Sequence, residues 1–289
     1  MKAVYVALRV VLSGFAYLLG LAIMAVLAPV LHLPTAKIIP GFSPHIVPAS
    51  VILGIGLLPL AANLTGSWLK RCLAVAVLIY VALGLNTLLE MKIFTGMLDG
   101  NPWLASLGSI LPAILAAVPL TVGSVAQGTQ TAGLGSFGVT GWTWRVLLAL
   151  IAFPVIYFFF GTCVGPIVVP YYRSATMVGQ YGSILGLHVP AMSVILRTLF
   201  LRSATFLAGS LPAIALWARS RKRLFFALGL AHAVTVGIFG LVVASFFPMA
   251  MRLAHGVEIT CDSFAYAAVL TLLFASVTKA AESTVSAAA

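Results

Sequence analysis

Apolar residues fill long, nearly unbroken stretches of this chain, and short polar segments separate one stretch from the next. Each stretch approaches the roughly 20 residues that a helix needs to cross the hydrocarbon core of a bilayer. None alternates apolar and polar residues as the strands of a membrane barrel do, and backbone groups in hydrocarbon must bond within their own segment. We therefore predict eight helical spans, at residues 10–31, 48–68, 72–90, 104–125, 146–169, 192–217, 224–247 and 262–279.

The composition agrees with this pattern. Of the 289 residues, 62% are hydrophobic and only 7% are charged, whereas about a quarter of the residues in a soluble domain are charged. No segment has the composition of a separate soluble domain. The fold class that we predict is all-α: a polytopic integral membrane protein whose bundle of about eight transmembrane helices forms one domain over residues 1–289.

Positive charges predict how the bundle is oriented. If the N-terminus lies in the cytoplasm, most Lys and Arg residues fall at the cytoplasmic ends of the spans, most densely in "RSRKR" at 219–223. This is the positive-inside bias of membrane proteins. The tryptophans also fall at predicted span ends, where an indole is apolar on one side and hydrated on the other. We expect both termini to be cytoplasmic and the protein to lie in a cell membrane, such as the inner membrane of a bacterium.

The formal net charge of +11 raises the question of nucleic-acid binding. A nucleic-acid-binding module carries its cations as a patch on a folded surface, whereas the cations of this chain cluster at the ends of apolar runs. We therefore expect no nucleic acid among the partners. The expected partners are the lipid bilayer, an anionic small molecule or lipid, and, in one interpretation below, other membrane subunits.

The fifth span carries residues that interrupt helices. Pro154 lies in its middle, and Gly165 and Pro166 lie near its outer end. Proline removes one backbone hydrogen bond and clashes with the preceding turn. We expect a kink near Pro154 and a break around Gly165–Pro166, in a helix that either packs against its neighbours or lines a cavity.

The short motifs of several enzyme classes are absent. The sequence contains no Walker A motif, no HExxH and no G-x-S-x-G elbow, so whether the protein is an enzyme stays open. Cys163 and Cys261 fall toward the same predicted side, where a disulfide is conceivable, but two small, buried hydrophobic side chains are the favoured interpretation. The sequence indicates no cofactor.

The segment "MRLAHGVEITCD", residues 251–262, concentrates charge in a chain with only five acidic residues. Arg252, His255, Glu258 and Asp262 are spaced three or four residues apart, so on a helix they share one face. We expect a polar ridge that descends onto the outer end of the eighth span, with Asp262 closest to the hydrocarbon.

This ridge has several interpretations. His255 can act as general acid or base near neutral pH, with Glu258 or Asp262 orienting it. A His–Glu pair can also ligate a metal, but no further ligands can be named, so we predict no metal site. The simplest interpretation is a solvated helical turn whose charges pair with one another.

Arg202 lies about 10 residues, or ~15 Å, from the predicted outer end of the sixth span, near the middle of the bilayer. An ionised arginine there costs at least ~2.5–3.5 kcal/mol on insertion scales, so it should face the bundle interior beside a partner. The candidate partners are Glu90, Glu258 and Asp262, although no acid is predicted at the depth of Arg202 itself.

Two outcomes are open for Arg202. It either forms a structural ion pair with one of these acids or faces a polar cavity open to the outside. With Arg173 and Arg197 nearby, such a cavity would be positive and suited to an anion. Asn86 and Glu90, four residues apart, share a face of the third span, which indicates that its polar side points inward. The two tyrosines before Arg173 are expected in the aromatic belt at the interface.

Three functional classes remain. The leading one is a transporter or lipid-handling protein with a positively lined, outward-facing site for an anionic small molecule or lipid headgroup. The second is a membrane-embedded enzyme with an acid–base site at the outer leaflet, and the third is a non-catalytic subunit or assembly factor of a membrane complex. The predicted ligand-binding residues are Arg202, Arg197, Arg173, Arg252 and Glu90, and the catalytic candidates are His255, Glu258 and Asp262.

Overall fold

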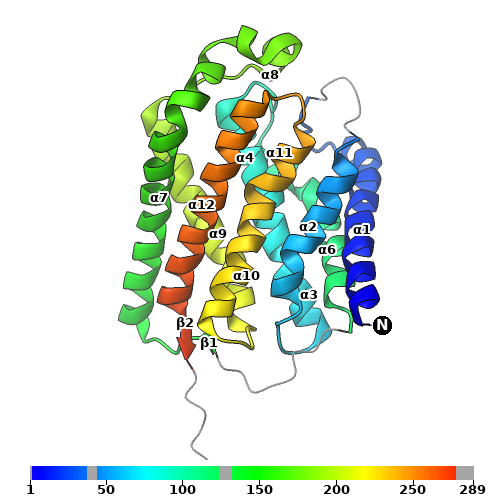
Figure 1. Cartoon of the computed structure of the whole chain (residues 1–289), viewed down its shortest axis with the longest axis vertical. Coiled ribbons are helices and arrows are strands. Elements are labelled where there is room, and N and C mark those ends of the chain that lie inside the picture. Colours follow the sequence, from blue (N-terminus) through cyan, green and yellow to red (C-terminus); the bar gives the residue numbers. More distant parts are fainter. Residues whose placement is uncertain (1, 38–43, 124–131, 278–289) are drawn as a thin grey trace, which may run out of the picture.

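A computed structural model shows the chain as a bundle of helices that stand side by side (Figure 1). It describes residues 2–37, 44–123 and 132–277. Seven helical stretches of the described residues are long and apolar enough to cross a membrane, and a shorter apolar helix, α2, packs within the same bundle against α1, α6 and α10. The predicted all-α membrane fold is confirmed.

The helices follow one another in the order of the expected spans. The first part of the chain forms α1 (Lys2–Val30), α2 (Ile46–Ala61), α3 (Trp68–Ile79), the π-helix η1 (Tyr80–Leu85), α4 (Asn86–Phe94), α5 (Pro102–Ser106), η2 (Leu107–Ser109) and α6 (Ile110–Thr121). The second part forms β1 (Ala132–Leu134), α7 (Val139–Arg173), η3 (Ala175–Tyr181), α8 (Gly182–Leu185), α9 (Met192–Ala215), α10 (Arg221–Ala233), the π-helix η4 (Val234–Ile238), α11 (Phe239–Val243), α12 (Met249–Phe274) and β2 (Ala275–Val277).

The two ends of the bundle differ. At the N-terminal end, where α1 begins, β1 and β2 pair antiparallel as a two-stranded ribbon (Figure 1). At the opposite end, here called the α8 end, η3 and α8 lie across the top of the helices (Figure 1). If the predicted orientation holds, the N-terminal end faces the cytoplasm and the α8 end faces outward.

Large side chains fill the interior toward the N-terminal end, and apolar side chains also cover the outside of the bundle. Trp217 and Phe274 are fully buried, whereas Leu272 on the same helix as Phe274 is 71% exposed. An apolar outer surface is stable in hydrocarbon but not in water. Trp217 lies just past the end of α9, as expected, but its ring is buried in the core rather than hydrated on one side, and its Nε1–H donates to the Ser220 carbonyl at 3.2 Å.

Helix α7 runs from Val139 to Arg173 without interruption, although Pro154 and Pro166 lie inside it. The expected break around Gly165–Pro166 is therefore wrong. One proline costs a single backbone hydrogen bond, whereas a break in hydrocarbon would leave several backbone groups without partners. The kink near Pro154 stays a prediction.

Helix α12 begins at Met249, well before the expected start of the eighth span at residue 262, and ends at Phe274. The segment 251–262 is therefore not an interfacial turn but the first half of the last long helix. Glu258 and Asp262 are 6% and 7% exposed. The helix can bury these carboxylates because they face the cavity described below rather than lipid.

Two spans contain π-helices that the sequence did not predict. η1 continues α3 into α4, and η4 continues α10 into α11, and the two π-helices contact each other inside the bundle. π-Helical turns occur often at functional sites. Both line the cavity, through Leu83 and Gly84 of η1 and through Val236 and Gly237 of η4.

Candidate functional site

A cavity of about 970 Å³ lies inside the bundle, and its lining extends to residues at the α8 end. Loop residues such as Thr35, Val189 and Phe247 line it near the α8 end, and its walls come mainly from α1, α4, α7, α9, α11 and α12. Its deepest lining residues include His232 and Tyr266. Tyr266 lies ~25 Å along α12 from the start of that helix. The cavity therefore extends past the middle of the bundle.

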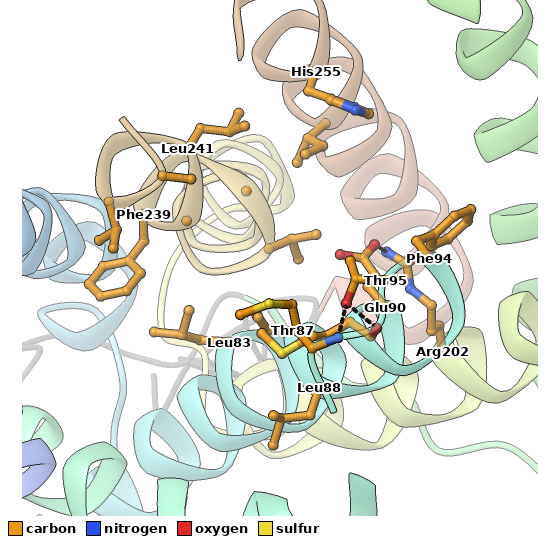
Figure 2. A pocket seen from close by; sticks show the side chains of 18 of the residues that line it. Leu83, Thr87, Leu88, Glu90, Phe94, Thr95, Arg202, Phe239, Leu241 and His255 are labelled. Atoms are coloured by element: carbon orange, nitrogen blue, oxygen red, sulfur yellow. Dashed lines mark hydrogen bonds and ion pairs between the residues drawn. The ribbon is translucent and has the colours of Figure 1, made fainter. Parts of the chain in front are cut away.

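Most of the cavity wall is aliphatic or aromatic, and its charged side chains come from α4, α9 and α12. Figure 2 shows Glu90 of α4 beside Arg202 of α9. The charged and imidazole side chains that these three helices contribute to the lining are Glu90, Arg202, His255, Glu258 and Asp262. This group, here called the charged cluster, contains every catalytic candidate and two of the predicted ligand-binding residues.

Arg202 is 3% exposed and is held by two side chains of α4. Its Nε donates to Asn86 Oδ1 at 2.7 Å, and its Nη2 lies 2.6 Å from Glu90 Oε1. Its guanidinium also lies over the rings of Phe153 and Tyr157, at 5.2 and 5.7 Å from the ring centroids. The two outcomes foreseen for Arg202 are thus combined, since the ion pair itself forms part of the cavity wall.

Glu90 lies closer to Arg202 than the sequence predicted. The predicted third span ended at residue 90, whereas the helix continues through α4 to Phe94. Glu90 therefore lies inside the helix and reaches the depth of Arg202, with its side chain one-third exposed to the cavity. The expectation that Asn86 and Glu90 point inward from one helical face is confirmed.

On α12, His255, Glu258 and Asp262 line the cavity from one helical face, as their spacing predicted. His255 Nδ1 lies 2.9 Å from Glu258 Oε2, and Tyr172 Oη lies 3.4 Å from His255 Nε2. Gly161 of α7 lets Glu258 approach, since a Cβ at that position would lie 3.3 Å from Glu258 Oε1. Tyr172 is therefore more than the belt residue that we expected.

Asp262 differs from Glu90 and Glu258 because, among the described residues, no cationic side chain lies within 4.0 Å of its carboxylate. Its Oδ1 is buried and makes no hydrogen bond, and its carboxylate interacts electrostatically with Glu258, Arg202 and Glu90. Arg202 is the only positive group among these three, and it is already engaged by Asn86 and Glu90.

Three predicted ligand-binding arginines lie away from the charged cluster. Arg173 and Arg197 are exposed near the α8 end and do not line the cavity. Arg252 donates from Nε to the Leu241 carbonyl at 2.8 Å and lines a neighbouring, smaller hollow. Long arginine stems near helix ends let the guanidinium reach the interface, away from the apolar interior.

The cavity is consequently not positively lined. Among the described residues, its lining contains one arginine, three carboxylates and the imidazoles of His232 and His255. The imidazole of His232 has a hydrogen-bond partner within the protein, because its Nε2 lies 2.9 Å from Ser210 Oγ. The expected positive charge is replaced by a paired Arg202 and an excess of acid.

Aromatic residues are the part of the site that the sequence patterns did not reveal. Tyr157, Phe158 and Tyr266 line the cavity together with Phe153 and Phe206. Each lies in an apolar run where an aromatic side chain is ordinary. Only the spacing of Tyr157 could have indicated an inward position, because it precedes Gly161 by one helical turn and thus shares a face of α7 with it.

Within the described residues, no group of three or more His, Cys, Asp or Glu side chains could hold a metal ion. The disulfide considered between Cys163 and Cys261 is not formed, and both thiols are free. Cys163 is exposed on α7 rather than buried as expected.

The chain matches no protein-family model, no curated protein and no solved structure. The function of the protein is therefore inferred from its site alone.

Proposed function

We propose that this multi-span helical membrane protein binds an amphipathic molecule, a single lipid or lipid-like compound, in the cavity and transports it or passes it on. The observation that carries this proposal is the cavity itself. It combines a mostly apolar wall with a charged cluster deep inside the bundle, and its lining reaches the α8 end. Apolar walls with a few convergent polar groups are typical of small-molecule sites.

The dimensions support a lipid-like ligand. Ligand pockets usually have volumes of about 300–1,000 Å³, and this cavity, of about 970 Å³, lies at the upper end of that range. An apolar tail would lie against residues such as Leu21, Met24 and Val236, and a polar group would reach the charged cluster.

The closed N-terminal half supports transport. Trp217, Leu224 and Phe274 are fully buried there, while the other half is hollow. A site near mid-membrane with access from one side is the arrangement expected of one state in alternating access. With the predicted orientation, this state faces outward.

The charge of the cavity changes the ligand class that we expected. The sequence favoured an anion because Arg173 and Arg197 were expected beside Arg202. Neither lines the cavity, and an anion would have to compete with Glu90 for Arg202. An anionic ligand therefore becomes the alternative that the experiments below discriminate against.

A membrane-embedded enzyme is the second candidate, and one observation favours it. His255 and Glu258 form a 2.9 Å contact that could serve as an acid–base pair, with Tyr172 on the other side of the imidazole. The depth of the cavity favours binding over catalysis, because a hydrolytic site at the outer leaflet would need only a shallow cup. The interpretation as a subunit of a membrane complex is weakened. It required intramembrane charges that pair with another chain, whereas Arg202 pairs with Glu90 of this chain.

Native mass spectrometry of the full chain, released gently from membranes, tests the proposed binding. We expect wild-type protein to carry a lipid-like adduct. Thr87→Trp should lose most of it, because Thr87 lines the cavity on α4 (Figure 2) and the indole would fill the space. Leu73→Trp is the matched control, since Leu73 is 49% exposed and lies outside the cavity lining. Equal adducts on the two variants would contradict the proposed function.

A further inference from the structure

We propose that the ligand of this cavity is a lipophilic cation, whose positive centre binds between Asp262 and Glu258. This inference rests on the proposed function and names the chemical class of its ligand. It reverses the sign of charge that the sequence suggested.

The charges near the ligand do not cancel within the protein. Arg202 is satisfied by Glu90 and Asn86, at 2.6 and 2.7 Å. Glu258 is contacted by His255, which is a full counterion only when protonated. Asp262 has no ion-pair partner within 4.0 Å among the described residues. The protein therefore presents, deep in the cavity, a carboxyl group without an ion-pair partner of its own among the described residues.

The burial of Asp262 indicates that its carboxylate binds a ligand. The residue is 7% exposed, and one carboxylate oxygen, Oδ1, is buried without a hydrogen-bond partner. Intramembrane acids normally pair with a cation or line an ion or substrate path. Asp262 lines the cavity, so a positive group there supplies the missing partner.

The aromatic rings around the acids suit an organic cation. Phe153, Tyr157 and Phe206 already lie under the Arg202 guanidinium at 5.2 to 5.7 Å, which shows that their faces accept positive charge. Tyr266 lies one helical turn beyond Asp262 and also lines the cavity. Ring faces attract cations within about 6 Å of the centroid, and more strongly where water is excluded.

The same walls argue for a large cation rather than a metal ion. A metal would need several oxygen or nitrogen ligands at close range, and no suitable group of three occurs among the described residues. The aliphatic surface of the cavity instead fits the apolar body of a lipophilic ammonium or phosphonium compound.

Two probe ions of the same shape and opposite charge provide the test: tetraphenylphosphonium and tetraphenylborate. Equilibrium dialysis is done against the full chain in nanodiscs, with empty nanodiscs as the blank. We expect saturable phosphonium binding, tighter than borate binding by about tenfold or more, the factor for one favourable ion interaction of ~1.4 kcal/mol. Asp262→Asn should weaken phosphonium binding by about the same factor.

Glu258→Gln is the second variant, used if Asp262→Asn does not fold, and it should also weaken phosphonium binding. Asp99→Asn is the control, because Asp99 lies in a loop with its side chain 79% exposed. Borate binding as tight as phosphonium binding, no saturable binding of either ion, or wild-type phosphonium affinity in both cavity variants would overturn the inference. If Thr87→Trp still lowered the binding of whichever ion is preferred, the proposed function would survive while the cation was rejected.

Discussion

The guanidinium of Arg202 is buried near the middle of α9, and its burial determines the placement of several other side chains. It fixes Glu90 and Asn86 on α4, and it stacks on rings of α7 and α9. The sequence was sufficient to predict that this residue faces inward and needs an acid. It could not identify Glu90 as the nearest one, because the depth of a side chain depends on where its helix ends.

Removal of Arg202 tests this pairing. We expect Arg202→Ala to insert normally but to lower stability by about 3 kcal/mol, the lower end of the range for breaking a buried pair, since Glu90 keeps partial exposure. The double variant Arg202→Ala/Glu90→Ala should be more stable than Arg202→Ala alone. Thermal unfolding in detergent measures both, with the exposed Lys222→Ala as control. Strictly additive losses would mean that the two residues do not interact.

At the scale of helices, the sequence predicted every long apolar helix but misjudged their details. The hydrophobic runs determine where helices form, and they suffice because hydrocarbon leaves a chain no other backbone structure here. The predicted break in α7 and the predicted start of the last helix at residue 262 were both wrong, and for the same reason. Local signals such as Pro166 or the charges of 251–262 were weighed without the neighbours that compensate them.

The π-helices lay beyond sequence analysis because no residue type demands them. They coincide with tight packing at glycines: a Cβ on Gly84 would lie 2.5 Å from Ser109 Cβ, and one on Gly237 would lie 2.6 Å from side-chain atoms of Ile259. Such contacts depend on which helices become neighbours, which the sequence alone does not specify.

Two glycines of one span test the role of this packing. Gly237→Ala should lower stability by about 1–3 kcal/mol through overpacking against Ile259 of α12. Gly240→Ala, three residues further on, meets nothing within 4 Å and should be neutral or slightly stabilising. The unfolding midpoints of the two variants, measured in the same detergent, give the difference in stability. A stable Gly237→Ala protein would show that η4 and α12 can separate at little cost.

For the whole molecule, the sequence predicted a membrane bundle with a polar site but not the sign of its charge. The expected positive charge depended on Arg173 and Arg197, which instead lie exposed near the α8 end and outside the cavity lining. Inside the cavity one paired arginine faces three acids. Residues from all seven long apolar helical stretches line the cavity. The charge of the lining therefore could not be predicted from any single stretch of sequence.

A cryo-electron microscopy map of the full chain in nanodiscs, with tetraphenylphosphonium added, tests this description most directly. We expect density for the probe inside the cavity between α4, α9 and α12, in contact with Asp262 and Glu258. A map in which the cavity is filled by side chains, with Asp262 bonded to a protein group and the probe elsewhere, would contradict it.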